Sequence, residues 1–183
     1  PDLWMNTWKL VEQQKKPLQR FLKQAFEHDS LSVILTGAGT SAFIGEVLQG
    51  PFQKNTQKQT TAIATTDLIS HPAHYFNANA TLLISFARSG ESPESVAALQ
   101  LANSFCKKIY HLIITCNPNG KLALSKNDST GQVYVFLLPP EANDQSLAMT
   151  GSFTSMLLAG LLISRINEIN ALEKQVRQLA AYA

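Results

Sequence analysis

Apolar residues along the chain form two alternating patterns, which predict strands that alternate with helices. In residues 18–26 they recur at the i, i+3, i+4, i+7 and i+8 spacing of one face of an amphipathic helix. Elsewhere they form short continuous runs of the kind found in buried strands. The expected strands are 31–36, 59–65, 81–85, 110–115 and 133–138. Further helices are expected at 42–48, 94–105, 152–163 and from 172 onward, and the first of these is predicted to stop at Gly50-Pro51.

This alternation favours an α/β fold with a parallel sheet covered by helices on both faces. With right-handed crossovers, the five strands form a three-layer αβα structure in the flavodoxin-like order 2-1-3-4-5. Residues 1–30 are expected to be a helical extension, 31–166 the α/β domain and 167–183 a closing helix. In this order the first and third strands are neighbours at the topological switch point, so the loops that follow them open into one crevice.

Both of these loops combine glycine with hydroxyl side chains and lead into a helix. The first is Gly37-Ala38-Gly39-Thr40-Ser41 and the second is Ala87-Arg88-Ser89-Gly90-Glu91-Ser92. Ser92 is a good N-cap and Pro93 suits the first helical position, so the second loop presents backbone N–H groups at the positive end of a helix. Such a loop can hold a phosphate or carboxylate. The alternative is an ordinary capped helix whose serines bond only to their own backbone.

Other candidates near this crevice have two interpretations each. Arg88 can contact a phosphate or project into solvent. The segment 150–152, which includes Thr150, can supply a third set of donors, although Ser152 can equally be a simple N-cap. The first loop also fits the Gly-x-Gly-x-x-Ala dinucleotide fingerprint, but Asp67 lies 30 positions after Gly37, where about 20 is usual.

Composition excludes several classes of function. The formal net charge is only +2 and no basic cluster is visible, so no nucleic-acid partner is expected. The longest apolar stretch, 156–163, is far short of the roughly 18 residues of a membrane span. Cys106 and Cys116 lack metal-ligand spacing and are expected to be reduced, buried thiols of a cytoplasmic protein. His71 and His74 have no partner carboxylate nearby, so neither a metal nor a cofactor is expected.

The two loops also resemble those of a known family. The stretches Leu35–Gly45 and Ser85–Ser95 are similar to the phosphosugar-binding loops of a sugar isomerase (SIS) domain. Over almost its whole length the chain resembles the tagatose-6-phosphate ketose/aldose isomerases, a family that includes galactosamine-6-phosphate deaminases. Three shorter stretches, 65–68, 114–117 and 148–150, fit the same family.

The resemblance implies a hexose 6-phosphate as ligand and assigns roles to the loops. Ser89, Gly90 and Ser92 would hold the phosphate. Ala87 stands where the family has a further serine, and Arg88 is the expected substitute. Gly39, Thr40 and Ser41 would lie along the sugar, opposite Thr150 and its neighbours.

The resemblance also implies aldose–ketose isomerisation, with deamination if carbon 2 carries an amine. It places the general base in a second SIS domain beyond residue 183, so no catalytic residue is named in this chain. Separately, the apolar helices at both ends, with Trp4 and Trp8, favour burial against another chain or the missing half, and a homo-oligomer is expected. Two alternatives stay open: a non-catalytic phosphosugar-sensing SIS module and a dinucleotide-binding Rossmann domain.

Overall fold

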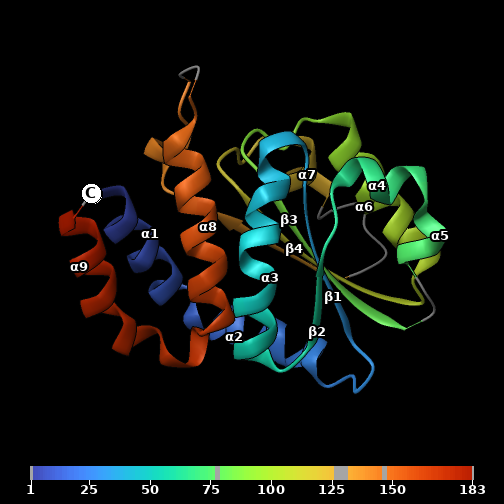
Figure 1. The fold of residues 1–183 in the computed structure, drawn as a ribbon, viewed down its shortest axis with the longest axis horizontal. Helices are drawn as coiled ribbons and strands as arrows, with labels where there is room; N and C mark the ends of the chain where they lie inside the picture. The colour runs from blue at the N-terminus through green and yellow to red at the C-terminus, as the bar shows by residue number, and fades with distance from the viewer. Residues whose placement is uncertain (1, 77–78, 126–131, 146–147, 183) are drawn as a thin grey trace.

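A computed structural model describes residues 2–76, 79–125, 132–145 and 148–182, and a five-stranded sheet forms its centre (Figure 1). The strands pair in the order β2-β1-β3-β4-β5, and all neighbours are parallel. The α/β class and the order 2-1-3-4-5 are therefore confirmed. The strand bounds are β1 Ser32–Gly37, β2 Gln59–Ala62, β3 Ala80–Ala87, β4 Lys108–Thr115 and β5 Gln132–Leu137.

Helices cover both faces of this sheet and complete the three layers (Figure 1). The first face carries α1 Asp2–Gln13, α2 Lys15–Phe26, α3 Ala42–Thr56 and α8 Thr150–Ser164. The second face carries α4 Thr65–Ser70, α5 Pro72–Tyr75, α6 Pro93–Phe105 and α7 Lys121–Leu124. A 3₁₀ segment, Ile166–Leu172, leads to α9, Glu173–Tyr182, which packs against α1. Within the described ranges, no helix has the length and apolar character needed to cross a bilayer.

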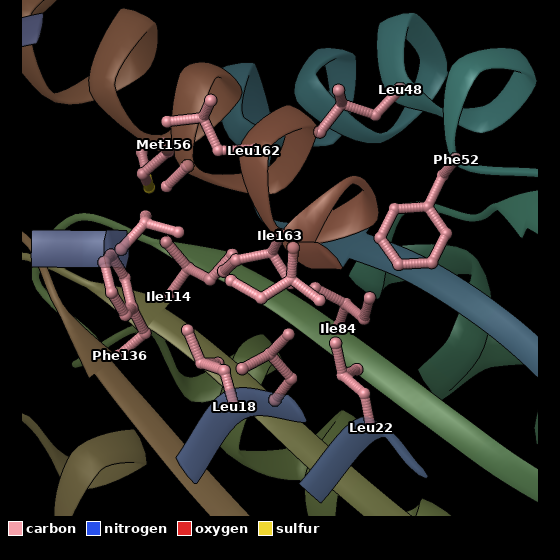
Figure 2. Close-up of a cluster of buried hydrophobic side chains, with 14 of the residues drawn as sticks. Leu18, Leu22, Leu48, Phe52, Ile84, Ile114, Phe136, Met156, Leu162 and Ile163 are labelled. Carbon is pink, nitrogen blue, oxygen red and sulfur yellow. The ribbon is translucent and has the colours of Figure 1, made fainter. Parts of the chain in front are cut away.

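The larger hydrophobic core lies between the sheet and its first face of helices. Figure 2 shows side chains from α2, α3 and α8 pointing toward side chains of the central strands. Strand β3 is buried at all eight positions, which explains why it reads as a continuous apolar run and not as an alternating one. The labelled members of this core are Leu18, Leu22, Leu48, Phe52, Ile84, Ile114, Phe136, Met156, Leu162 and Ile163.

Helix α3 does not stop at Gly50-Pro51, so that prediction is wrong. The helix continues to Thr56 with Pro51 inside it, and ends where Gln57 takes a left-handed conformation (φ 58°). Phe52 is 1% exposed and belongs to the core beside Leu48. Burying this aromatic ring holds the second half of the helix in place against the local preference of proline.

Two other local predictions need correction. The strand expected at 59–65 ends at Ala62, and the two short helices that follow it, α4 and α5, were not predicted. Ser152 is not an N-cap, because α8 already begins at Thr150. In each case the short polar segments carry too little periodicity to fix an element boundary.

His111 is a fully buried histidine in β4. Its Nε2 lies 2.9 Å from Oδ1 of Asn103, an atom that only accepts, so the neutral ring donates there. Its Nδ1 has no partner within the described part of the chain. Burial lowers the pKa of His111 to about 4. Protonation of Nδ1 would therefore place a positive charge on a buried ring whose Nδ1 has no acceptor among the described residues.

We expect the free energy of unfolding to fall as pH drops from about 6.5 to about 4. In that window the unfolded chain binds a proton at residue 111 that the folded chain does not, which removes roughly 3 kcal/mol for this pKa difference. His111→Gln should flatten this part of the urea-unfolding profile relative to the exposed control His71→Gln. Identical pH slopes in the two variants would contradict this account.

Candidate functional site

The loops after β1 and β3 lie side by side and line two adjoining cavities. A small cavity of about 130 Å³ lies over the second loop, and a large cavity of about 390 Å³ extends toward the start of α8. Ala38, Ser41 and Arg88 line both, so the two cavities form one site. The small cavity is also lined by Phe86, Ala87, Ser89, Gly90, Ser92 and Ser95. The large cavity is also lined by Thr40, Ala148, Met149, Ser152, Phe153 and Met156.

The backbone of the second loop is held from one side by the segment between β4 and α7. The carbonyl oxygen of Arg88 accepts from the Cys116 backbone N–H at 3.1 Å and from Thr115 Oγ1 at 3.3 Å. The carbonyl of Ser89 accepts from Asn117 Nδ2 at 3.0 Å. The carbonyl of Gly90 also accepts, from the Leu122 backbone N–H in α7 at 3.0 Å. Three successive carbonyls of the second loop are therefore hydrogen-bonded.

Because these carbonyls point toward the β4–α7 segment, the amides of the loop are turned the other way. Within the described residues, the backbone N–H groups of Ser89 and Gly90 have no acceptor. Gly90 has φ +65°, a conformation that side chains disfavour. Gly120 is needed for a different reason, because a Cβ at that position would fall on the Ser89 carbonyl oxygen. The result is a pair of backbone donors facing a cavity.

Ser92 caps α6, as predicted. Its Oγ accepts from the Ser95 backbone N–H at 3.2 Å and donates to Ser95 Oγ at 2.7 Å. Ser89 Oγ accepts from the Glu91 N–H at 3.3 Å. The hydroxyl hydrogens of Ser89 and Ser95 therefore remain available to a ligand in the small cavity, whereas that of Ser92 does not.

Ser95 was not among the predicted site residues. It is buried and lines the small cavity. The sequence could have indicated Ser95 through its position three residues after the N-cap Ser92. At that position the capping box places a polar side chain that faces back toward the cap.

The first loop is tightly folded. A Cβ on Gly37 would lie 2.6 Å from the Ser41 backbone, and Gly39 has φ +55°. Thr65 Oγ1 donates to the carbonyl of Gly37 at 3.3 Å. This turn brings Thr40 and Ser41 to the large cavity, while Gly39 is exposed and lines neither cavity.

A carboxylate occupies the N-terminus of α8. Asp144 Oδ2 accepts from the N–H groups of Gly151 at 2.7 Å and Ser152 at 3.2 Å. The Asp144 backbone carbonyl also accepts from Arg88 Nη1 at 3.1 Å, which fixes the guanidinium beside both cavities. Thr150 is exposed and lines neither cavity, although Met149 and Ser152 line the large one.

Arg88 is the one charged side chain among the described residues that line the two cavities. Glu91 is paired instead with Lys121, whose Nζ lies 3.6 Å from its Oε2 and whose backbone N–H donates to its Oε1. Glu46 and Glu94 line neither cavity. The site therefore attracts anions, and its described part offers no carboxylate that could exchange a proton with a ligand.

The two cysteine thiols do not supply a group that exchanges a proton with a ligand either. Cys106 and Cys116 are both free and buried. Burial, and secondarily the charge of Asp144, raise the pKa of Cys116 to about 12, although Arg88 opposes the shift. Cys116 therefore stays protonated at neutral pH.

A third hollow, of about 550 Å³, lies at the other end of the molecule. It is formed where α2, α3 and α8 end, and its lining includes Lys23, Asn55 and Ser164. Ligands of open parallel sheets bind at the carboxyl ends of the strands, where the loops after β1 and β3 meet. We therefore take the pair of smaller cavities as the candidate functional site.

Comparison with known proteins agrees with this location. Residues 28–164 match the SIS domain. The chain is 41% identical over 172 residues to the D-galactosamine-6-phosphate deaminase AgaS of Escherichia coli, which covers 93% of this chain and 44% of that protein. It is 47% identical over 163 residues to D-galactosamine-6-phosphate deaminase AgaS of Shewanella sp. (strain ANA-3), covering 85% and 42%.

A solved structure gives the same result. The crystal structure of tagatose-6-phosphate ketose/aldose isomerase from Escherichia coli superposes with a TM-score of 0.91 at 38% identity, covering 100% of this chain and 50% of that one. The chain thus spans about half the length of the relatives it matches. With most of its residues matched to one family and the expected loops at the switch point of its sheet, the chain belongs to the SIS domain family.

Proposed function

We propose that this chain is the sugar-phosphate-binding part of an enzyme that acts on hexose 6-phosphates. The proposed reaction is aldose–ketose isomerisation, accompanied by deamination when carbon 2 carries an amine. One observation carries the proposal: backbone and hydroxyl donors converge on the small cavity at the N-terminus of α6. The names of the relatives, galactosamine-6-phosphate deaminase and tagatose-6-phosphate ketose/aldose isomerase, support this choice of substrate class.

The phosphate would lie in the small cavity. The N–H groups of Ser89 and Gly90 and the hydroxyls of Ser89 and Ser95 are the donors for its oxygens. The positive end of the α6 dipole and the Arg88 guanidinium would balance its charge. The N-terminus of α8 does not compete for the phosphate, because Asp144 already occupies its amides.

The sugar would extend into the large cavity. Thr40 and Ser41 provide hydroxyl groups for its polar edge. Met149, Phe153 and Met156 give the opposite side an apolar surface suited to the C–H groups of a hexose. Binding of the phosphate would then hold carbons 1 and 2 in a fixed place relative to a catalytic group.

The chemistry requires a general base that moves a proton between carbons 1 and 2 through an enediol or enolamine intermediate. No carboxylate in the described part of the chain lines either cavity. We propose that a second SIS domain supplies this base. The matched relatives, more than twice the length of the matched region, have room for one.

A non-catalytic sensor of phosphosugars is the second candidate, and the lack of a base among the described lining residues favours it. Both candidates predict that the 183-residue chain binds galactosamine 6-phosphate without turning it over. They differ for a longer protein carrying two SIS domains, which should convert galactosamine 6-phosphate and water to tagatose 6-phosphate and ammonia only if the enzyme proposal is right. The product can be followed by phosphorus NMR.

Removal of two hydroxyls tests the phosphate site. We expect the double variant Ser89→Ala, Ser95→Ala to bind galactosamine 6-phosphate at least tenfold more weakly by calorimetry, since hydrogen bonds to a charged group contribute about 1.5–3 kcal/mol each. Ser92→Ala should instead lower the free energy of unfolding by about 1 kcal/mol, because it removes a cap.

The matched control is Ser104→Ala, which removes an exposed hydroxyl from the far end of α6. Unchanged affinity in the folded double variant would rule out the small cavity as the phosphate site.

A glycine that lines neither cavity tests the geometry of the loop. Gly120→Ala places a methyl group on the Ser89 carbonyl oxygen, so the second loop must move. We expect affinity for galactosamine 6-phosphate to fall about tenfold or more, a loss of about 1.4 kcal/mol or more. Affinity for unphosphorylated galactosamine, which lacks the group that the loop binds, should change little. An equal loss for both sugars would show that the loop does not act through the phosphate.

A further inference from the structure

We propose that Trp4 is a positioning residue for the candidate site, which orients Arg88 through a series of hydrogen bonds across the first turn of α8. Trp4 lies in α1, before the residues 28–164 that match the SIS domain. It lines neither cavity, so its effect on a ligand must pass through other residues. The consequence for binding rests on the proposed function, whereas the series of hydrogen bonds does not.

The first hydrogen bond joins two helices that are far apart in the sequence. Helices α1 and α8 pack side by side (Figure 1), and the Trp4 Nε1–H donates to Thr154 Oγ1 at 3.1 Å. An indole N–H only donates, so the hydroxyl hydrogen of Thr154 is left for another acceptor. The Thr154 hydroxyl donates to the Thr150 carbonyl oxygen at 2.8 Å, and the Gly151 carbonyl oxygen lies 3.4 Å from it.

Two peptide groups of α8 carry the series onward. The carbonyl of Thr150 and the N–H of Gly151 belong to one planar peptide group, and the carbonyl of Gly151 and the N–H of Ser152 belong to the next. Asp144 Oδ2 accepts from both N–H groups, at 2.7 and 3.2 Å. The Thr154 hydroxyl and the Asp144 carboxylate therefore hold the same two peptide planes from opposite edges.

Close packing at Gly151 supports this arrangement. A Cβ at that position would lie 3.1 Å from Asp144 Oδ2 and 3.4 Å from Leu3 Cδ2. Glycine thus lets the carboxylate and the start of α1 approach the same point of the α8 backbone. Leu3 and Trp4, which are adjacent in α1, therefore restrain the first turn of α8 by packing and by a hydrogen bond.

The last hydrogen bond leads from Asp144 into the site. The Asp144 backbone carbonyl accepts from Arg88 Nη1 at 3.1 Å, and Arg88 lines both cavities. The carboxylate that holds α8 and the carbonyl that holds Arg88 belong to one residue. A shift of the first turn of α8 must therefore also move the acceptor of the guanidinium. Through this series, a helix outside the matched domain fixes the one charged side chain that lines the described site.

The second tryptophan of α1 provides a matched control. The Trp8 Nε1–H donates to the carbonyl of Ile169 at 3.0 Å, in the 3₁₀ segment after α8. Trp4→Phe and Trp8→Phe each remove one indole N–H from the same helix, but only the first breaks the series that reaches Arg88. Thr154→Val removes the receiving hydroxyl at nearly constant shape, whereas Thr154→Ser keeps it.

NMR of the ligand-free chain, labelled with ¹⁵N, tests the series of hydrogen bonds. We expect Trp4→Phe to speed amide hydrogen exchange of Gly151 about fivefold, the effect of losing one hydrogen bond of ordinary strength. It should also lower the order parameter of the Arg88 Nε–H. Thr154→Val should have the same two effects, whereas Thr154→Ser and Trp8→Phe should leave both quantities at their wild-type values. Wild-type values in Trp4→Phe and Thr154→Val, or equal changes in Trp8→Phe, overturn the proposal.

Calorimetry with galactosamine 6-phosphate tests the consequence for binding. Trp4→Phe should weaken binding about fivefold and Trp8→Phe should not. In a chain that carries Arg88→Gln, adding Trp4→Phe should cause no further loss, because the group that it positions is absent. Equal losses with and without Arg88 would overturn the proposal, since Trp4 would then act on the site by another route. If the wild-type chain does not bind this sugar phosphate, the proposed function fails, and the NMR measurement decides on Trp4 by itself.

Discussion

The site depends on the hydrogen bonds that fix the carbonyls of the second loop. Three consecutive carbonyl oxygens accept from the end of β4, the segment after it and α7, so the intervening amides must face the other way. A loop without these bonds could rotate its peptide planes and present oxygens to the cavity, which would repel an anion. Gly90 and Gly120 allow this arrangement, the first through its left-handed backbone and the second through close contact with Ser89. The anion-binding character of the site is thus set by a segment that does not itself touch the small cavity.

The dipole of α6 adds to the positive potential at the site, whereas the dipole of α8 contributes little. Both helices begin at the carboxyl edge of the sheet, and both have a dipole whose positive end is near the site. Asp144 neutralises the end of α8 and, through its backbone, holds Arg88 in place. The end of α6 is capped by the neutral hydroxyl of Ser92, and Glu94 in its first turn lines neither cavity. This asymmetry gives the site one end rich in hydrogen-bond donors and one end that is partly apolar.

The sequence was sufficient to predict the sheet and its switch point, because the apolar runs of the three central strands, β1, β3 and β4, correspond to strands buried on both faces. It also located the second loop, where Ser92 and Pro93 signal a helix start. It could not reveal Asp144 as the cap of α8, because that carboxylate lies seven residues before the first N–H it accepts from, outside any local capping pattern. It also failed at Pro51, where burial of Phe52 outweighs a local helix-breaking preference. Contacts that lie outside the local sequence patterns decided both.

The most direct test of the anion site is a titration of the chain, labelled with ¹⁵N, with galactosamine 6-phosphate. The structure predicts that the amide resonances of Ser89 and Gly90 shift most, and that unphosphorylated galactosamine leaves them nearly unchanged. Shifts confined to Gly151 and Ser152 would place the anion at α8 instead. That result, or no shift in the second loop, would contradict the account.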